Sequence, residues 1–580
     1  MSSDATTTPG SVVTGGPPAG ESTAERDGRG TPPGSDSGRG AVERPNDHGR
    51  AAQAGGRGWA RAGGRRWAGV VGAIAVGGIV LASLAIVGLA ASRASILSPP
   101  SRVAFPGWMA GPLGWIGRSF HPDQATLKLI LSCSVGGMFV AYVVVLSCAS
   151  RIRARWAIGG VVAVQVIFFL SPPLSLTDVF NYLNYGRMEI LHGLNPYTTI
   201  PALGPPSDPT FLLSNWHQLL SPYGPLFTIF SFALVPLGVA AGFWVLKASL
   251  MIAGLATLWL VWRCAELVGR DPLSAVLFVG LNPLVLVWGL GGDHNDFFMV
   301  FFVMLAFYLL LRARAGRDGT ARDGAGAGGA GGGAGAGGEA GAGGRAGGGG
   351  TGDRPARRLL SFLDGARRPL PAGEAGPARE LGAGFVLVAA VAIKASAGIL
   401  LPVVLLGAGR RLRLLGGMIA GAVVFGGASL YAFGPHLPNL AQQSRLVTLA
   451  GLPNVVGSIL GLGGETDSMK TILAGVLVVA AIGGAAWSWR TRRWIEASAF
   501  VTVALLVTLS WALPWYVLWL LPLAALARRP GVRVAALVIS AYLLVIWMPN
   551  MTDVIHAVGY KPSLTLLGQE RQQKTLLLLH

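Results

Sequence analysis

One short stretch of the sequence brings acids and aromatic hydroxyls together at helical spacing. Asp178, Tyr182, Tyr185 and Glu189 follow one another at intervals of four, three and four residues, so in a helix they share one stripe. A carboxylate can accept the proton of a sugar hydroxyl, and aromatic faces with hydroxyls beside them can hold a sugar ring. The stripe therefore predicts a sugar-handling site in which Asp178 is the general base.

A simpler interpretation of Asp178 is that it caps the helix. Ser175 and Asp178 have the spacing of a capping box, and an acid in the first turn suits the positive end of the helix dipole. The neighbouring polar residues favour a catalytic role over this structural one. The same stretch, residues 171–225, supplies the further substrate-binding candidates Arg187, Asn195, Tyr197, His217 and Tyr223.

Three other polar sites are predicted to lie on the same side as Asp178. They are the turn Asp293–His294–Asn295–Asp296, Lys394, and the loop that contains Arg445. A preorganised cation stabilises the charge that develops on a departing phosphate, so Lys394 or Arg445 is expected to face a phosphate. His294 and Asp296 are expected to hold a sugar.

Each of these sites also has a structural interpretation. Residues 293–296 could be ordinary turn chemistry, and Lys394 could be a snorkelling residue at a membrane interface. Asp293 and His294 without a second cluster at ligand spacing are weak evidence for a metal. The residues require no cofactor, and they leave the use of a divalent metal open.

Composition places these residues in a membrane protein. The 580 residues are 52% hydrophobic and only 13% charged, whereas charged residues make up roughly 25% of soluble proteins. The net charge of +19 comes from short basic runs between apolar segments, which are typical of topology signals and argue against nucleic-acid binding. The three cysteines are not at metal-ligand spacing, so neither a zinc site nor a disulfide framework is indicated.

Apolar segments of about twenty residues, with Lys/Arg-rich connectors assigned to the cytoplasm, predict the fold class. It is an all-α polytopic membrane protein with about 12 to 14 transmembrane helices and external juxtamembrane helices. The N-terminus is predicted to be cytoplasmic and residues 171–225 to be external. Residues 226–240 are expected to form a juxtamembrane or re-entrant helix, 274–290 a span, and 383–408 a tight hairpin of two short helices with Lys394 at its outer tip.

Composition also divides the chain into segments. Trp511, Trp515 and Tyr516 at the ends of late apolar segments are interpreted as interfacial belt residues instead of substrate contacts. The predicted segments are a disordered cytoplasmic tail (1–66), an N-terminal transmembrane module (67–314), a low-complexity cytoplasmic linker (315–380), a C-terminal transmembrane module (381–550) and a tail (551–580).

Three runs of the sequence resemble a known family: TDVFNYLNYGRMEILHGLNPYTTIP, SNWHQLLSPYGPLF and GGDHNDFF. They are similar to the polyprenol-phosphomannose-dependent α-1,6-mannosyltransferases of actinobacterial envelopes, of the MptB type, which are integral membrane enzymes of the GT-C fold. The resemblance extends from about residue 68 to about residue 548 and omits the linker. In the GT-C fold the catalytic aspartate typically follows the first span, whereas two further apolar segments precede Asp178 here.

The resemblance implies an inverting transfer of mannose from β-mannosyl phosphopolyprenol to an α-1,6-mannan chain on a phosphatidylinositol mannoside anchor, in lipomannan synthesis. It implies that Asp178 is the catalytic base and that Asp296, with Asp293 beside it, is the second external acid. The implied partners are the lipid-linked donor, the glycolipid acceptor and membrane lipids. The implied location is the plasma membrane, with the site facing the periplasm or cell wall.

Two other functions use much the same residues. A GT-C enzyme that transfers another sugar, such as arabinose from a decaprenyl donor, would need the same base and cation. A transporter or lipid flippase is the alternative from another class. Such proteins tend to have paired repeats and ionisable residues near the middle of the membrane, whereas most acids here lie at the ends of apolar segments.

Overall fold

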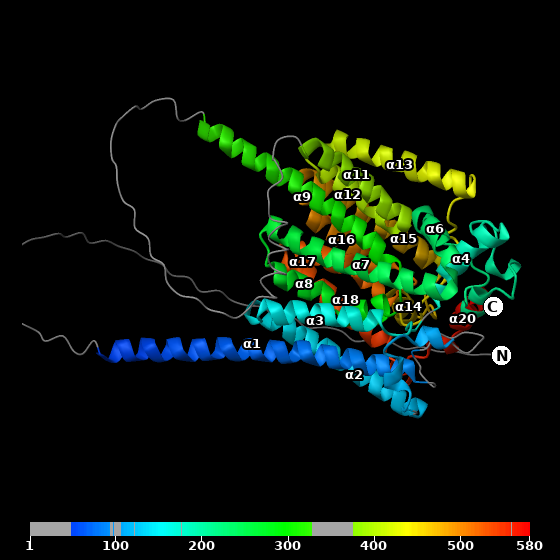
Figure 1. Ribbon diagram of the computed structural model, residues 1–580, viewed down its shortest axis with the longest axis horizontal. Coiled ribbons are helices and arrows are strands. Elements are labelled where there is room, and N and C mark those ends of the chain that lie inside the picture. Colours follow the sequence, from blue (N-terminus) through cyan, green and yellow to red (C-terminus); the bar gives the residue numbers. More distant parts are fainter. Residues whose placement is uncertain are drawn as a thin grey trace, which may run out of the picture. The chain divides into compact units, whose positions relative to one another are not determined.

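The computed structural model describes residues 48–92, 97, 106–120, 122–175, 177–327, 375–557 and 559–579. Within these ranges the chain forms helices joined by loops, and it contains no strand (Figure 1). The helices before residue 328 are α1 (His48–Ala91), α2 (Gln124–Cys148), α3 (Ala154–Phe169), α4 (Asp178–His192), α5 (Pro209–Leu213), α6 (Pro225–Leu234), α7 (Gly238–Val268), α8 (Pro272–Gly280) and α9 (Asp296–Ala327). The later ones are α11 (Ala375–Ile393), α12 (Leu400–Gly407), α13 (Arg411–Phe433), α14 (Leu452–Ile459), α15 (Asp467–Thr491), α16 (Trp494–Thr508), α17 (Val517–Leu526), α18 (Pro530–Ile546), α19 (Met551–Ala557) and α20 (Leu566–Leu579).

Seven helices in the described part of the chain are long and apolar enough to cross a membrane. They are Trp67–Ala91, Gln124–Arg151, Pro225–Val268, Asp296–Gly316, Gly376–Ile393, Arg411–Phe433 and Asp467–Thr491. Five further apolar helices have only 10 to 17 residues. Large apolar side chains such as Val423 of α13 and Val479 of α15 are exposed, which suits contact with lipid and not with water. The predicted class, an all-α polytopic membrane protein, is confirmed, but its apolar helices differ in length more than the prediction assumed.

Small residues allow two of the long helices, α11 and α13, to pack closely. α11 packs against both α9 and α13, and the three lie side by side in Figure 1. A Cβ atom on Gly384 of α11 would lie 2.1 Å from the carbonyl oxygen of Leu414, and one on Gly417 of α13 would lie 1.9 Å from that of Leu381. Close backbone contacts of this kind are typical of membrane helices. They fix α11, and therefore the position of Lys394 directly after its last residue.

The segment expected as one span at residues 274–290 is not a continuous helix. α8 ends at Gly280, and the chain resumes after Pro283 as a π-helical turn over Val285–Leu290. Proline has no N–H to donate and disfavours a helical conformation in the residue before it, here Asn282. The whole segment is buried in the protein. The break leads the chain into the turn at residues 291–295 from within the protein.

The hairpin expected at residues 383–408 is present, but its arms are unequal. α11 has 19 residues and α12 has 8, so only the second arm is short. Glu380 and Gly407 line one pocket, which shows that the segment enters and leaves at the same end. Lys394 lies at the reversal, in an extended conformation between the two arms.

Residues 226–240 form α6 and the beginning of α7, with a kink at Gly238, whose φ is 75°. The short separate helix that the sequence predicted is therefore observed as α6. Together with α7, however, it belongs to one candidate span of 44 residues, Pro225–Val268.

Helices extend into segments that were expected to lack structure. α1 begins at His48, within the predicted tail, and α9 continues to Ala327, within the predicted linker. Residues 1–47 and 328–374 of those segments lie outside the described residues. The C-terminal segment is also folded, because α20 is joined to the beginning of α15 by an ion pair of 2.7 Å between Arg571 Nη2 and Asp467 Oδ1.

Candidate active site

α4 presents the carboxylate of Asp178 to the protein interior instead of using it as a cap. Thr177 is the N-cap residue and its side chain makes no capping hydrogen bond, while Ser175 lies in the left-handed region with φ of 72°. The expected capping box of Ser175 and Asp178 is therefore wrong. Asp178 Oδ1 instead accepts a hydrogen bond of 2.8 Å from the indole Nε1 of Trp216. A long-range contact thus holds the carboxylate in place.

A small polar pocket surrounds this carboxylate. Asp178, Tyr182 and Tyr185 of α4 line it, as their helical spacing predicted, and Tyr223 meets the ring of Tyr182 edge-on at 4.7 Å. The other lining residues come from distant parts of the chain and many are aromatic: Asn181, Trp216, Leu219, His294, Lys394, Gln443, Leu446, Trp511, Leu513, Trp515 and Tyr516. The fold therefore gathers several separate segments around one acid.

The electrostatics of the pocket suit a general base. Burial raises the pKa of Asp178 to about 6, although the hydrogen bond from Trp216 and the charge of Lys394 oppose this rise. His294 Nδ1 lies 3.5 Å from Asp178 Oδ2 and 3.5 Å from the Tyr182 hydroxyl. Burial and the charge of Lys394 lower the pKa of His294 well below its usual value, so a neutral imidazole meets the carboxylate and no ion pair forms. A carboxylate with a pKa near 6 is ionised at neutral pH and is more basic than an ordinary aspartate.

A second acid is held in an ion pair beside the pocket. Lys394 Nζ lies 2.9 Å from both carboxylate oxygens of Asp296, and Trp519 Nε1 donates to Asp296 Oδ1 at 2.6 Å. The same ammonium lies 4.9 Å from the ring centre of Tyr516 and 5.4 Å from that of Trp519, within the range of cation–π contacts. Asp296 does not line the pocket. Its contacts fix Lys394, which does.

Asp293 supports the turn from the interior. It is fully buried with φ of 56°, and Lys247 Nζ of α7 lies 3.5 Å from its Oδ2. Lys247 also donates to the carbonyl oxygen of Ser171 at 2.8 Å, which links the turn to the segment before α4. Burial raises the pKa of Asp293 to about 6, and the charge of Lys247 opposes the rise. The turn at residues 293–296 is therefore covered by other parts of the protein and is not exposed to solvent. Asn295 has no partner for its side-chain amide among the described residues, and only His294 of the turn reaches the pocket.

Several predicted binding residues instead hold the loop after α4 together. Arg187 Nε lies 3.1 and 3.0 Å from the two carboxylate oxygens of Asp208, and His192 Nε2 lies 3.1 Å from Oδ2. Asp208 also accepts the backbone N–H of Thr210 at 2.9 Å, which caps α5. Arg187 therefore joins α4 to α5 and does not reach the pocket.

Asn195, Tyr197 and His217 also have structural contacts. Asn195 Nδ2 donates to the carbonyl oxygen of Phe433 at 2.8 Å, at the end of α13. The Tyr197 hydroxyl donates to the carbonyl oxygen of Tyr223 at 2.9 Å, which holds the backbone of a pocket residue. The His217 ring stacks on a phenylalanine of α5 at 3.9 Å. None of these three side chains lines the pocket.

Glu189 and Arg445 lie away from the pocket. Glu189 is 11 residues after Asp178, which in a helix is about 16 Å along the axis. The stripe that contains both acids therefore continues beyond the edge of the pocket. Arg445 is exposed and does not line the pocket or the neighbouring cavity described below.

The sequence interpretation missed the tryptophans. Trp216 and Trp519 donate to the two acids, and Trp515 is only 2% exposed and stacks on His294 with 3.5 Å between ring centres. The interpretation of Trp511, Trp515 and Tyr516 as belt residues is wrong, because all three line the pocket. The available signal was the spacing of four residues between Trp511, Trp515 and Trp519, which is close to one helical turn.

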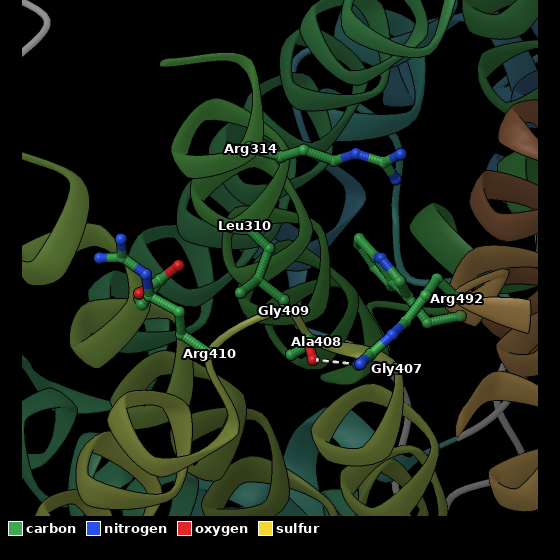
Figure 2. Close-up of a pocket in the computed structure, with 9 residues that line it drawn as sticks. Leu310, Arg314, Gly407, Ala408, Gly409, Arg410 and Arg492 are labelled. Carbon is green, nitrogen blue, oxygen red and sulfur yellow. Dashed lines mark hydrogen bonds between the residues drawn. The ribbon is translucent and has the colours of Figure 1, made fainter. Parts of the chain in front are cut away.

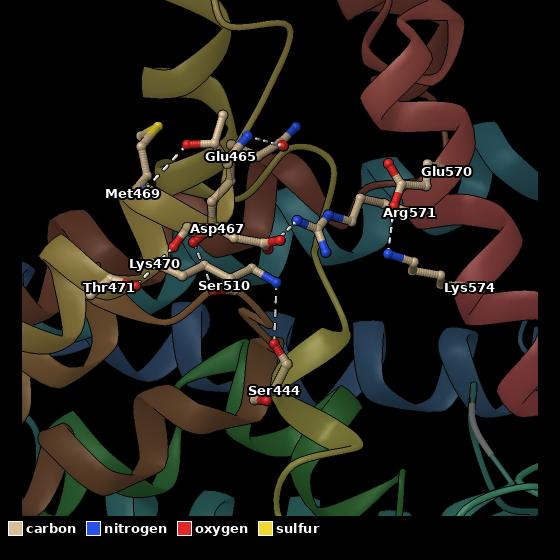
Figure 3. Close-up of polar contacts among 12 residues, drawn as sticks. Ser444, Glu465, Asp467, Met469, Lys470, Thr471, Ser510, Glu570, Arg571 and Lys574 are labelled. Atoms are coloured by element: carbon tan, nitrogen blue, oxygen red, sulfur yellow. Dashed lines mark hydrogen bonds and ion pairs between the residues drawn. The ribbon is translucent and has the colours of Figure 1, made fainter.

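A larger cavity of about 700 Å³ lies beside the polar pocket, and Tyr223, Lys394 and Tyr516 line both. Much of its wall is apolar and comes from α15 and from the segment after α16, including Leu473, Ala474, Leu477 and Leu509. Lys470 is a second cation in this wall, and its Nζ donates to the carbonyl oxygen of Ser444 at 3.2 Å (Figure 3). Such a cavity has room for an apolar chain with an anionic head. Within the described ranges, no three acid, histidine or cysteine side chains are arranged to hold a metal ion.

Comparisons with known proteins agree with the resemblance noted in the sequence. A family model described as "Alpha-(1->6)-mannopyranosyltransferase, N-terminal domain" matches residues 66–410, and the model "MptB C-terminal domain" matches residues 447–565. Alpha-(1->6)-mannopyranosyltransferase A of Mycobacterium tuberculosis is 31% identical over 200 residues, which are 32% of this chain and 37% of that protein. A second alpha-(1->6)-mannopyranosyltransferase of the same organism is 27% identical over 406 residues, 63% of this chain and 65% of that protein.

The similarity therefore spans between about a third and two thirds of the length of these curated relatives. No solved structure matches this chain. Because the first family model covers more than half of the sequence, the chain belongs to the alpha-(1->6)-mannopyranosyltransferase family.

Proposed function

We propose that this protein is an inverting glycosyltransferase that moves mannose from β-mannosyl phosphopolyprenol to an α-1,6-mannan chain on a phosphatidylinositol mannoside anchor. The observation that carries the proposal is the Asp178 carboxylate. It is largely shielded from solvent, with 14% of its side chain exposed, has a pKa of about 6, and lines a polar pocket beside an apolar cavity. The names of the relatives support mannose as the sugar and a 1,6 linkage as the product.

In the proposed reaction the 6-hydroxyl oxygen of the acceptor mannose attacks C1 of the donor mannose. Asp178 accepts the proton of this hydroxyl as the new C–O bond forms. The bond between C1 and the phosphate oxygen breaks on the opposite face, and its electron pair stays with the polyprenyl phosphate. A β-linked donor thus gives an α-linked product, and the carboxylate gains one proton that it must lose before the next turnover.

The larger cavity is the proposed donor site. Lys394 lies where the polar pocket and the cavity meet, and Lys470 stands farther along the cavity wall. A cation held in place by Asp296 needs no reorganisation when the phosphate departs. The apolar surface of α15 in the same wall, with Leu509 beside it, would receive the first isoprene units.

The arrangement of charges supports an orientation in the plasma membrane. Asp296 begins α9, and Arg314 lies 18 residues later in the same helix, which is about 27 Å away and close to the thickness of the hydrocarbon core. Arg410 and Arg492 lie at the same pocket as Arg314. Basic residues are enriched on the cytoplasmic side, so Asp178 is proposed to face the periplasm or cell wall.

Replacing the base tests the proposal directly. Membranes that contain Asp178→Asn are expected to transfer labelled mannose from β-mannosyl phosphopolyprenol to a mannoside acceptor at least about 100-fold more slowly than wild type. Glu189→Gln is the matched control, because it removes an acid from the same helix outside the pocket. Full activity of Asp178→Asn at a normal expression level would contradict the assignment of the base. Transfer from an arabinosyl phosphodecaprenol donor, with none from the mannosyl donor, would contradict the assignment of the sugar.

A further inference from the structure

A second pocket, distant from Asp178, collects positive charge at one end of the helix bundle. The pocket is lined by Leu310 and Arg314 of α9, Glu380 of α11, the Gly407–Arg410 segment at the end of α12, Arg492 after α15, and Trp494 at the beginning of α16. Figure 2 shows Arg410 and Arg492 on opposite sides of this segment, Leu310 pointing toward it from α9, and the Arg314 side chain running across farther along α9. Its volume is about 240 Å³, which is enough for a phosphate with a small substituent.

Among the described residues, no acid forms an ion pair with the three arginines of this pocket. Neither the side chain of Arg314 nor that of Arg410 has a hydrogen-bond or ion-pair partner there. Arg492 Nη1 donates to the carbonyl oxygen of Ala408 at 2.8 Å, which directs its guanidinium toward the pocket floor and leaves its other N–H groups available. The one acid, Glu380, has an ion pair of 3.7 Å with Arg413.

Helix polarity adds to the positive charge. α13 begins at Arg411 beside the pocket, with Arg410 as its N-cap, no side-chain capping hydrogen bond and no acid in the first turn. The beginning of a helix carries a partial positive charge and exposed N–H groups, so arginines at this position are unfavourable unless an anion joins them. Arg492 is also strained, with φ of 60°. Unpaired arginines, an uncapped helix start and a strained residue thus all border the same pocket.

The position of the pocket identifies the source of the anion. The candidate spans in α9, α11, α13 and α15 all have an end here, and the end of α9 that lies here is opposite to Asp296. Beyond the pocket, α13 presents Leu415, Ile419 and Val423 at intervals of four residues, and all three side chains are exposed. A lipid whose phosphate lies in the pocket would therefore find apolar surface for its acyl chain on α13.

We infer that this arginine pocket binds the phosphodiester headgroup of an anionic phospholipid, in the leaflet opposite to the one that faces Asp178. The buried carboxylate of Glu380 disfavours a doubly charged phosphate and suits a singly charged diester whose headgroup carries hydroxyl donors, such as a glycerol or inositol. This binding is separate from the proposed transfer reaction and does not depend on it.

Native mass spectrometry of the purified full-length protein in detergent, titrated with phosphatidylglycerol or phosphatidylcholine, tests the inference. Wild type is expected to retain one phosphatidylglycerol molecule after phosphatidylcholine has dissociated. Arg410→Gln, which removes a side chain without a structural hydrogen bond, should weaken that binding about tenfold, because each lost contact to a charged group costs on that order. Arg410→Lys should weaken it less, since the charge remains.

Arg153→Gln is the matched control. It removes one arginine at the beginning of α3, outside the pocket, and is expected to leave binding unchanged. Equal losses in Arg153→Gln and Arg410→Gln would overturn the inference, because surface charge alone would then explain the binding. Equal thermal stabilisation of wild type by inorganic phosphate and by phosphatidylglycerol would overturn the assignment to a lipid. Circular dichroism of each variant shows whether the helices have formed.

Discussion

Two acids of the segment 171–225, Asp178 at the beginning of α4 and Asp208 before α5, have opposite surroundings. Asp178 lies largely shielded beside aromatic rings with a single hydrogen-bond donor, Trp216, on Oδ1, and the loss of solvent around it raises its pKa to about 6. Burial acts on Asp208 too, but hydrogen bonds from Thr210 and His192 and the charge of Arg187 outweigh it and hold the pKa of Asp208 below its usual value. A carboxylate that accepts several hydrogen bonds, as Asp208 does, holds neighbouring segments together. A carboxylate with few hydrogen-bond donors around it, as Asp178 has, can accept a proton.

The largest expected difference between the two acids is in the effect of their replacement on kcat. Asp178→Asn should reduce kcat by at least about 100-fold, since the pocket then has no ionised base. The melting temperature should stay close to that of wild type, because the asparagine still accepts the hydrogen bond from Trp216. The two measurements together separate loss of the base from loss of the fold. A residual rate within tenfold of wild type would show that another group accepts the proton.

Lys394 is expected to have the next largest effect, and to affect both activity and stability. Lys394→Met should reduce kcat/KM roughly 10- to 100-fold, because the departing phosphate loses a preorganised cation. It also leaves the carboxylate of Asp296 buried without its partner, which costs about 3 to 5 kcal/mol of unfolding free energy.

The double variant Lys394→Met/Asp296→Asn separates these two effects. Removing both charges should restore much of the stability, while activity stays low. If activity returned with stability, Lys394 would act only by keeping Asp296 neutralised.

The pH dependence gives a smaller and more specific effect. Asp178 must be ionised to act as the base, so kcat/KM of wild type should rise as the pH increases through about 6 and level off above it. Trp216→Phe removes a hydrogen bond that lowers the pKa of Asp178, so the acid limb should move to higher pH. Trp511→Phe is the control, because its ring meets Trp216 edge-on at 6.5 Å but Asp178 takes its hydrogen bond from Trp216. A shift to lower pH in Trp216→Phe would contradict this assignment.

Two features were predicted correctly from the sequence: the fold class and the side of α4 that faces the pocket. Both depend on the local pattern of residues. Membrane spans depend on local hydrophobicity, and the stripe of Asp178, Tyr182 and Tyr185 depends on the period of one helix. Both can be read from neighbouring residues. The prediction of one continuous span at 274–290 differs from the structure because a proline after Asn282 interrupts an otherwise apolar run. Composition alone also does not show that protein, instead of lipid, surrounds this segment.

The partners of the acids could not be predicted in this way. Trp216 lies 38 residues from Asp178, and Lys394 lies 98 residues from Asp296. The first pairing depends on how the loop between α5 and α6 folds back on α4, and the second on how α11 packs against α9. The sequence also suggested Arg187 as a substrate-binding residue, because a polar residue near a motif does not by itself show which side of its helix faces the pocket.

The smallest expected effect on activity comes from Asp208, whose contacts lie outside the pocket. Asp208→Asn removes the acid that joins Arg187, His192 and the beginning of α5, and leaves the half-buried Arg187 without an anion. Unfolding free energy should fall by about 2 to 4 kcal/mol, and the melting temperature should fall with it. Because none of these groups touches the pocket, kcat measured well below the new melting temperature should change less than about twofold. A loss of kcat as large as that of Asp178→Asn, in protein that is still folded, would contradict this expectation. It would mean that the contacts of Asp208 shape the pocket and that the effects of the two acids are not independent.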